Sequence, residues 1–119
     1  MVPAPLQNLT EMLPQGVFAI VPDGGVTYLN PAGCDALGIT PAELAEGINL
    51  FDFIDEAHRA YLRRRLAVIL AGAPGQLAEY RIRRRDGTPL PAMIHAARLR
   101  VAGEVIGLQG LLIDITHRE

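Results

Sequence analysis

The sequence contains no serine, no lysine and no tryptophan, and its single cysteine is Cys34. The lack of serine removes one of the usual nucleophiles of covalent catalysis. One cysteine excludes an internal disulfide and suits a reducing compartment, so we expect a cytoplasmic domain. Cys34 stands close to Ala36 and Leu37. This setting indicates a small buried side chain, because free cysteine is among the most buried residue types.

Spacings that would indicate a metal centre or an acid–base pair are also missing. The three histidines, His58, His95 and His117, do not occur as a pair on one helix face. Three carboxylates lie close together where a helix is expected to begin: Asp52, Asp55 and Glu56. Acidic side chains are favoured at helix N-termini, so these residues need no catalytic explanation. We therefore predict no metal site and no catalytic residue, and we expect that the chain is not an enzyme.

Long apolar segments are absent as well. No stretch approaches the ~20 apolar residues that a membrane-spanning helix needs. The first residues also lack the charged and then apolar pattern of a secretion signal. We expect no membrane contact by this domain.

All eleven basic residues are arginines, and two clusters stand out, Arg63-Arg64-Arg65 and Arg81 with Arg83-Arg84-Arg85. Such clusters can mark a nucleic-acid surface. The net charge of −2 and the scarcity of aromatic residues among the arginines argue against that function. We expect solvated or interface-paired arginines and no nucleic-acid partner.

The 119 residues fit one domain, and half of them are hydrophobic, which is typical of a folded chain. Two β-rich segments, Val17–Val21 and Val26–Leu29, flank the turn segment Asp23-Gly24-Gly25. Glycine tolerates the backbone angles of tight turns, so the two segments should form a hairpin. The first segment is apolar at nearly every position, which predicts burial on both faces.

Two short helices should follow this hairpin. Asn30 suits the N-cap position, Pro31 the first helical position and Gly38 the end of the first helix. The segment from Thr40 to Glu43 is a capping box that should begin the second helix, and Gly47 should end it.

Two further helices are predicted on either side of this region. Leu6, Leu9 and Leu13 form a narrow apolar stripe on a short helix that precedes the first strand. Asp55 should cap the longest helix, whose buried face carries Leu62, Leu66 and Ile69, while Arg63 and Arg64 should turn away from the core.

The last third of the chain reads as three strands, over residues 77–84, 90–100 and 105–115. The turn segments Arg85-Asp86-Gly87 and Ala102-Gly103-Glu104 join them, so the pairing should be antiparallel. In the first of these strands Tyr80 and Ile82 alternate with arginines, as in a half-buried strand. Two strands, then helices, then three strands predict an α+β domain with its helices on one sheet face.

The order and spacing of five short motifs resemble those of a PAS domain, a small sensory module of signalling proteins. The motifs are Asp23-Gly24, Asn30-Pro31-Ala32, Leu37-Gly38, Arg85-Asp86-Gly87 and Asp114-Ile115-Thr116, within residues 6–119. The resemblance implies the strand order 2-1-5-4-3. The whole chain, 1–119, is then one domain, with a helical cap (1–14), a core (16–115) and the start of a truncated signalling helix (116–119). One departure is Val21, since the family often has an acidic residue where the first strand ends.

A cavity between the helices and the sheet is the expected ligand site. Its predicted lining is apolar apart from two polar side chains: Leu50, Phe51, Phe53, His58, Leu62, Leu66, Tyr80, Ile82, Ile94 and Leu108. PAS relatives bind haem, flavin or small metabolites in this place. Haem is disfavoured, because the family's histidine position falls nearer Leu62 than His58. Two alternatives remain open: the cavity binds an unknown small apolar ligand, or the core is filled and binds none.

The resemblance also implies a role in signal relay within a larger signalling protein, such as a histidine kinase or a cyclic-nucleotide-handling enzyme. The alternative is a dimerisation and relay domain that binds no ligand. Relay should involve Asp114, Ile115 and Thr116, with Arg84 or Arg85 as the basic partner of Asp114. Thr116 and Glu119 form a second capping box, which predicts a helix leading to a linked effector domain. We expect a homodimer through Leu6, Leu9, Leu13 and the outward-facing Met93.

Overall fold

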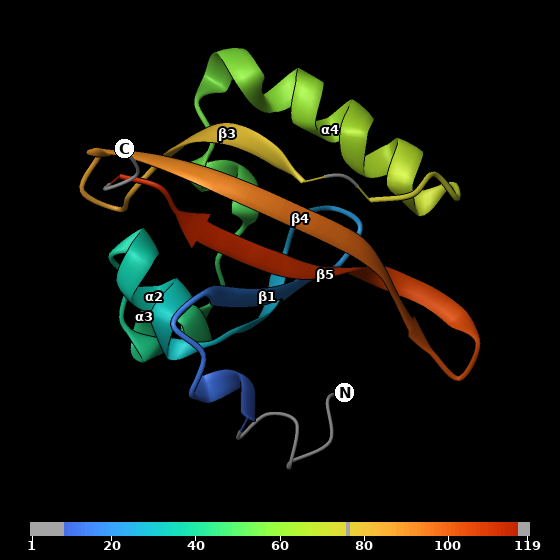
Figure 1. The fold of residues 1–119 in the computed structure, drawn as a ribbon, viewed down its shortest axis with the longest axis horizontal. Helices are drawn as coiled ribbons and strands as arrows, with labels where there is room; N and C mark the ends of the chain where they lie inside the picture. Colours follow the sequence, from blue (N-terminus) through green and yellow to red (C-terminus); the bar gives the residue numbers. More distant parts are fainter. Residues whose placement is uncertain (1–8, 76, 117–119) are drawn as a thin grey trace.

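A computed structural model describes residues 9–75 and 77–116. Its centre is one antiparallel sheet with the strand order β2-β1-β5-β4-β3, as predicted (Figure 1). The strands are β1 Gly16–Ile20, β2 Val26–Leu29, β3 Ala78–Arg83, β4 Pro89–Val101 and β5 Glu104–Asp114. Each predicted strand end lies within one residue of the observed one.

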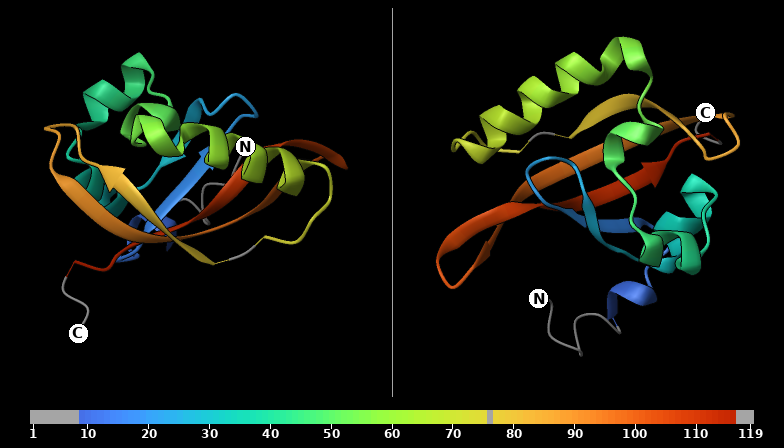
Figure 2. Two further views of the ribbon diagram at one scale, coloured as in Figure 1. Left: turned by 90° about the horizontal axis from the view of Figure 1, so that it is seen from above. Right: turned by 180° about the vertical axis from the view of Figure 1, so that it is seen from behind.

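The helices α2, α3 and α4 lie on one side of the sheet (Figure 2). Their bounds are α2 Pro31–Leu37, α3 Pro41–Glu46 and α4 Glu56–Leu70, with a short 3-10 helix, η1, at Leu50–Phe53. Residues 9–11 are helical ahead of β1, where an N-terminal helix was predicted. Leu6 lies outside the described residues.

The predicted ends of the two short helices are confirmed. The Asn30 side chain accepts a hydrogen bond from the Gly33 backbone N–H, and Gly38 closes α2 with φ of 74°. A left-handed backbone of this kind favours glycine. In α3 both bonds of the capping box between Thr40 and Glu43 are present. Local side-chain chemistry therefore sets the path of the chain from β2 to η1.

The predicted side-chain cap of the longest helix is wrong. Asp55 occupies the N-cap position of α4 but makes no capping hydrogen bond with its side chain. Its carboxylate instead lies 3.3 Å from the Nε of Arg83 on β3. The competing guanidinium explains the difference, because a charged donor is a stronger partner than a neutral backbone N–H.

The long strand β4 begins with two prolines, Pro89 and Pro91. β5 ends at Asp114, opposite Ala92, so the two prolines lie beyond the regular pairing with β5. Proline has no N–H to contribute to a ladder and is tolerated at such an edge. Their carbonyls still have donors, since Pro91 O accepts from the Ile115 N–H at 3.0 Å and Pro89 O accepts from the Arg84 guanidinium.

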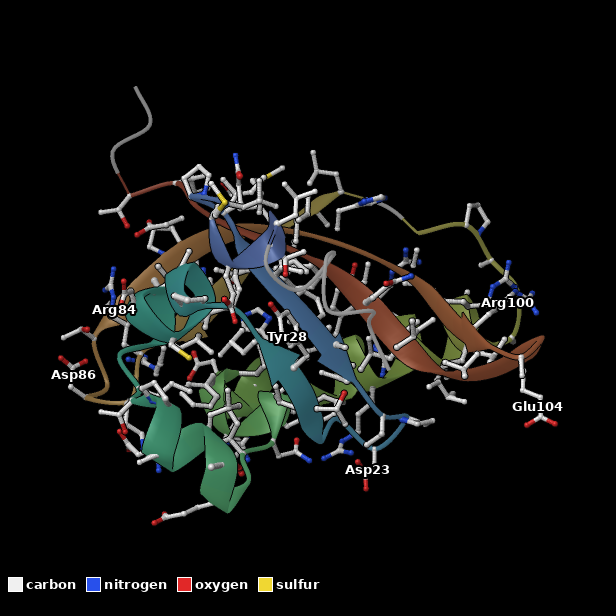
Figure 3. All side chains as sticks on the ribbon, turned by 90° about the horizontal axis from the view of Figure 1, so that it is seen from below. Asp23, Tyr28, Arg84, Asp86, Arg100 and Glu104 are labelled. Carbon is white, nitrogen blue, oxygen red and sulfur yellow. The ribbon has the colours of Figure 1, made fainter. Side chains whose placement is uncertain are left out.

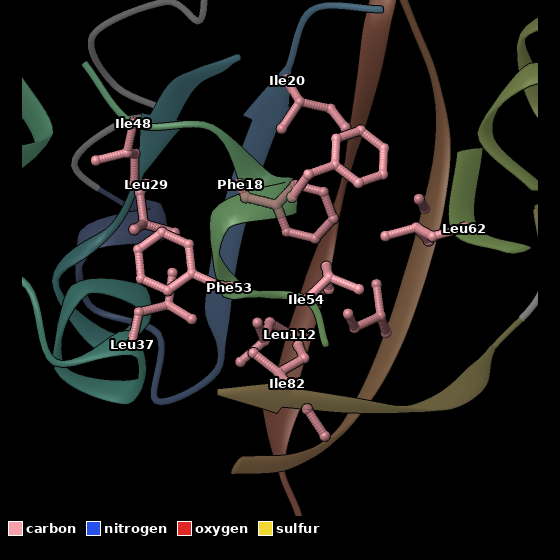
Figure 4. Close-up of a cluster of buried hydrophobic side chains, with 14 of the residues drawn as sticks. Phe18, Ile20, Leu29, Leu37, Ile48, Phe53, Ile54, Leu62, Ile82 and Leu112 are labelled. Atoms are coloured by element: carbon pink, nitrogen blue, oxygen red, sulfur yellow. The ribbon is translucent and has the colours of Figure 1, made fainter. Parts of the chain in front are cut away.

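The core lies between the sheet and the helices, and Figure 4 shows its central side chains. Phe18, Phe53, Ile82 and Leu90 are buried, and the buried face of α4 carries the predicted Leu62, Leu66 and Ile69. The ring of Phe18 packs over Gly110, where an added Cβ would overlap both the ring and the His95 carbonyl. Both faces of β1 are largely covered, as predicted.

Candidate functional site: the interior cavity and the hairpin ion pairs

A small cavity lies between α4 and the sheet, where a ligand site was predicted. Its volume is about 20 Å³. A space of this size holds about one water molecule (~10–15 Å³ or more is needed). The lining residues are Phe18, Ile20, Leu50, Leu62, Arg65, Leu66, Ile69, Tyr80, Ile94 and Ala96.

Half of the residues predicted to line the cavity do so: Leu50, Leu62, Leu66, Tyr80 and Ile94. Phe53, Ile82 and Leu108 are buried elsewhere in the core. The sequence reasoning missed five lining residues: Phe18, Ile20, Arg65, Ile69 and Ala96. Phe18 and Ile20 belong to the segment predicted to be buried on both faces, and Ile69 to the predicted buried face of the longest helix.

Few polar groups reach the cavity. His58 is exposed on α4 and does not line it. Asn49 is used locally, because it accepts from the Phe51 N–H at 2.9 Å and donates to Asp23 O at 3.1 Å. Burial raises the pKa of Tyr80, and the neighbouring Tyr61 adds to this, while the Arg65 guanidinium lowers the pKa. A ligand here would meet mainly hydrocarbon, with Tyr80 and Arg65 as the polar side chains of the lining.

Arg63 is exposed, as predicted, but its side chain contacts the domain surface. Its guanidinium carbon lies 4.1 Å from the centre of the Phe51 ring. This cation–π contact covers Phe51 from the solvent side. Phe51 therefore lines a separate outer hollow, together with Arg63, Leu66 and other residues, and not the interior cavity.

The β3–β4 hairpin is tied to three other parts of the chain by ion pairs, which we call the hairpin clasp. The pairs are Arg83 Nε to Asp55 Oδ1 at 3.3 Å, Arg84 Nη2 to Asp114 Oδ2 at 3.8 Å, and Arg85 Nε to Glu43 Oε2 at 3.2 Å. Each pair is partly exposed, so the solvent screens it and it adds little to the stability of the fold. The clasp fixes geometry more than it adds stability.

Asp114 holds the end of β5 in two ways. One carboxylate oxygen accepts hydrogen bonds from the backbone N–H of Thr116, at 2.8 Å, and from its hydroxyl. The other oxygen faces Arg84, which also donates to Pro89 O on β4. The chain therefore leaves the sheet at a point joined to the hairpin. Of the two basic partners considered for Asp114, Arg84 is the one observed.

Arg85 has a different role from the one considered. Its backbone N–H donates to Leu37 O at the end of α2, at 2.8 Å, and its side chain pairs with Glu43 on α3. Thr40 backbone and side-chain hydrogen bonds and the Arg85 guanidinium lower the pKa of Glu43, with the backbone bond first among these causes. Arg85 thus connects the hairpin to the helices and not to β5.

The residues predicted for a dimer interface leave apolar surface uncovered. Leu9 is 57% exposed, while Leu13 and Met93 are half-buried. On the face of the sheet away from the helices, Met93 is a neighbour of His95, and Leu111 pairs with His95 from β5. His95 and Leu111 are exposed.

Within residues 9–75 and 77–116 no group of three or more His, Cys, Asp and Glu side chains is placed to hold a metal ion. No helix in this described part is long and apolar enough to cross a membrane.

An antiparallel five-stranded sheet with helices on one face and a small cavity under the longest helix defines a two-layer α+β domain. The family model described as the PAS fold matches residues 4–115, so the chain belongs to the PAS family. A PAS domain is a sensory module and is not itself catalytic.

Known proteins similar to this chain include a kinase and several PAS domains. Over 113 residues the chain is 27% identical to Sporulation kinase A of Bacillus subtilis (strain 168), a match that covers 95% of this chain and 18% of that protein. A domain of a sensory box sensor histidine kinase/response regulator from Geobacter sulfurreducens is 24% identical, with a TM-score of 0.76 over 92% of this chain and 91% of that one. The PAS domain of a protein from Colwellia psychrerythraea is 14% identical, with a TM-score of 0.84 over 96% and 97%.

Proposed function

We propose that this PAS domain relays a signal within a larger signalling protein, such as a histidine kinase, and that it does so as a dimer with a filled core. The observation that carries the proposal is the tie of Asp114 to Arg84, at 3.8 Å, where the chain leaves the sheet. A shift of the end of β5 against the hairpin would break or form this tie. Such a two-state contact is the kind of element that signalling requires.

The filled core is supported by the cavity volume of about 20 Å³. Drug-sized ligands occupy pockets of roughly 300–1,000 Å³. The alternative function, sensing of a small apolar ligand, requires α4 to move away from the sheet. The apolar lining of the cavity favours a hydrocarbon-like ligand in that case, and haem remains disfavoured because His58 is exposed.

Dimerisation is supported by the exposed apolar side chains of Leu9 and Leu111, which a monomer would leave in water. The proposal also locates the domain in the cytoplasm, since its one cysteine, Cys34, is a buried free thiol. Reducing compartments keep such thiols unpaired.

Relay is tested in a chimera in which this chain replaces the matching segment of Sporulation kinase A. Asp114→Ala should change the basal kinase activity at least threefold, because it removes the ion pair between the end of β5 and Arg84 in the hairpin turn. Arg84→Gln should reproduce the change, and the double variant should add nothing further. Asp86→Ala is the matched control, since Asp86 makes the same pair of hydrogen bonds to Thr88 within the hairpin tip and none to β5.

The relay proposal requires that the chimera and its Asp114→Ala variant differ in kinase activity. If their activities are equal while the isolated variant domain still folds, Asp114 is only a local turn residue. The relay proposal would then fail.

A further inference from the structure

β3 and the turn that follows it carry four arginines, and one of these four has no ion-pair partner in the described part of the chain. Arg83, Arg84 and Arg85 each face a carboxylate from another element. Arg81 is exposed on β3, and no carboxylate of residues 9–75 and 77–116 lies within ion-pair distance of it. Its guanidinium is therefore free to bind an anion.

Arg81 also lines a surface groove of about 320 Å³, far larger than the interior cavity. The strand register sets Arg81 opposite Pro91 and Arg83 opposite Pro89. Two arginines thus face two prolines across the pair of strands. Ile82 and Leu90 lie between them with side chains buried in the core, so their backbone forms the floor of the groove.

The charges in the groove select an anion at one end. Its lining contains two arginines and one carboxylate, Asp55, which gives a net charge of +1. Asp55 already pairs with Arg83, so attraction for an anion is concentrated at Arg81. The proline rings and the aliphatic stems of the arginines offer apolar contact beside it.

The shape of the groove favours an extended peptide over a small molecule or a nucleic acid. The groove is open to solvent along one side, whereas small-molecule sites enclose most of their ligand. Two residue pairs span roughly 7 Å along a strand, which is the length of two to three extended residues. One free guanidinium does not suffice for nucleic acid, which binds through several phosphate contacts.

We propose that this groove, which we call the Arg81 groove, binds an acidic peptide segment of a partner protein. One carboxylate of the segment pairs with the Arg81 guanidinium, and a neighbouring apolar side chain packs on Pro91 and Pro89. The site is separate from the interior cavity and from Asp114, so it stands or falls independently of the relay function.

The probe is a blocked pentapeptide with one aspartate between leucines, compared with the same peptide carrying asparagine. In NMR titrations the aspartate peptide should give saturable shifts of the Ile82 and Leu90 amide signals, with at least fivefold weaker binding of the asparagine peptide. Arg81→Gln should remove the difference between the peptides. Arg100→Gln is the matched control, because Arg100 lies at the end of the domain opposite the hairpin tip, which Arg84 and Asp86 mark (Figure 3).

A second variant tests the charge argument in the opposite direction. Asp55→Asn removes the only carboxylate of the groove lining and releases Arg83, so binding of the aspartate peptide should tighten at least threefold. Equal binding of both peptides, no saturable shift with either, or an unchanged affinity in Arg81→Gln would overturn the proposal. Preferential binding of a short single-stranded oligonucleotide would overturn it as well.

Discussion

At the residue scale, Asn30 is the side chain on which the start of the fold depends most. It is completely buried, and its amide makes four hydrogen bonds. The oxygen accepts from the backbone N–H groups of Val17 and Gly33, and the nitrogen donates to the carbonyls of Thr10 and Gln15. One side chain thus joins the segment before β1, β1 itself and the start of α2.

Replacing Asn30 by alanine should lower the free energy of unfolding by about 3 kcal/mol, because buried backbone groups lose their partners. Chemical denaturation measures this loss. The control is Asn49→Ala, which removes a half-buried cap of η1 and should cost about 1 kcal/mol. Equal losses in the two variants would contradict the central role of Asn30.

Two carboxylates, the half-buried Glu43 and the exposed Asp86, should make the stability depend on pH in the acid range. Thr40 and Arg85 lower the pKa of Glu43, and hydrogen bonds from Thr88 lower that of Asp86. A lowered pKa means that the stabilisation is present above the ordinary carboxyl pKa near ~4 and is lost as the pH falls through the lowered value. Denaturation midpoints of Glu43→Gln should therefore fall less steeply below about pH 4 than those of the wild type. Parallel curves would refute the assignment.

At the element scale, α4 decides whether the core has room for a ligand. It packs on the sheet through Leu62, Leu66 and Ile69, and only a cavity of about 20 Å³ remains beside them. Arg59 and Arg63 fix its first turns from outside, since Arg59 donates to Ile54 O at 3.1 Å and Arg63 covers Phe51. The helix is therefore held on two sides in the closed position.

Leu66→Ala should open this space at a cost of about 3 kcal/mol in the free energy of unfolding. The enlarged apolar cavity should then bind xenon, which would raise the melting temperature of the variant under xenon pressure and leave the wild type unchanged. Val68→Ala is the control, because Val68 is 45% exposed on the other face of the same helix. A wild type that gains as much from xenon as the variant would show that its cavity is already open.

The elements themselves could be predicted from the sequence, because turn and cap residues act locally. Asn30, Thr40 and Gly38 have the roles that their chemistry predicts. The site was harder to predict, since cavity lining and ion pairing depend on how separate elements meet. Asp55 was predicted to cap the helix because the sequence does not show that Arg83, 28 residues away, lies beside it in the fold. The same reason explains why the choice between Arg84 and Arg85 stayed open until the structure placed Asp114.

At the scale of the whole molecule, the face of the sheet away from the helices and the segment before β1 are the surfaces left for association. Leu9 and Leu111 are exposed there, and Met93 on the same sheet face is half-buried. The clasp lies near the tip of the β3–β4 hairpin, and its Asp114 lines a surface hollow together with Pro14 and Gly16. The relay contact is therefore close to the segment before β1.

Leu9→Glu should weaken the dimer at least tenfold without unfolding the domain, because it places a charge in an apolar contact. Sedimentation equilibrium gives the dissociation constant. Val68→Glu adds the same charge on the helix side and should leave association unchanged. A wild type that stays monomeric at high concentration would contradict the predicted dimer.

The mass of the native particle tests the central claim, a dimer that relays without a core ligand, most directly. Native mass spectrometry of freshly purified protein should give twice the chain mass of 12.9 kDa and no further mass. Denaturation should then release only the chain. A native mass that exceeds the dimer mass by that of a small molecule, which is then lost on denaturation, would contradict the filled core. The alternative function, sensing of a small ligand, would then be favoured.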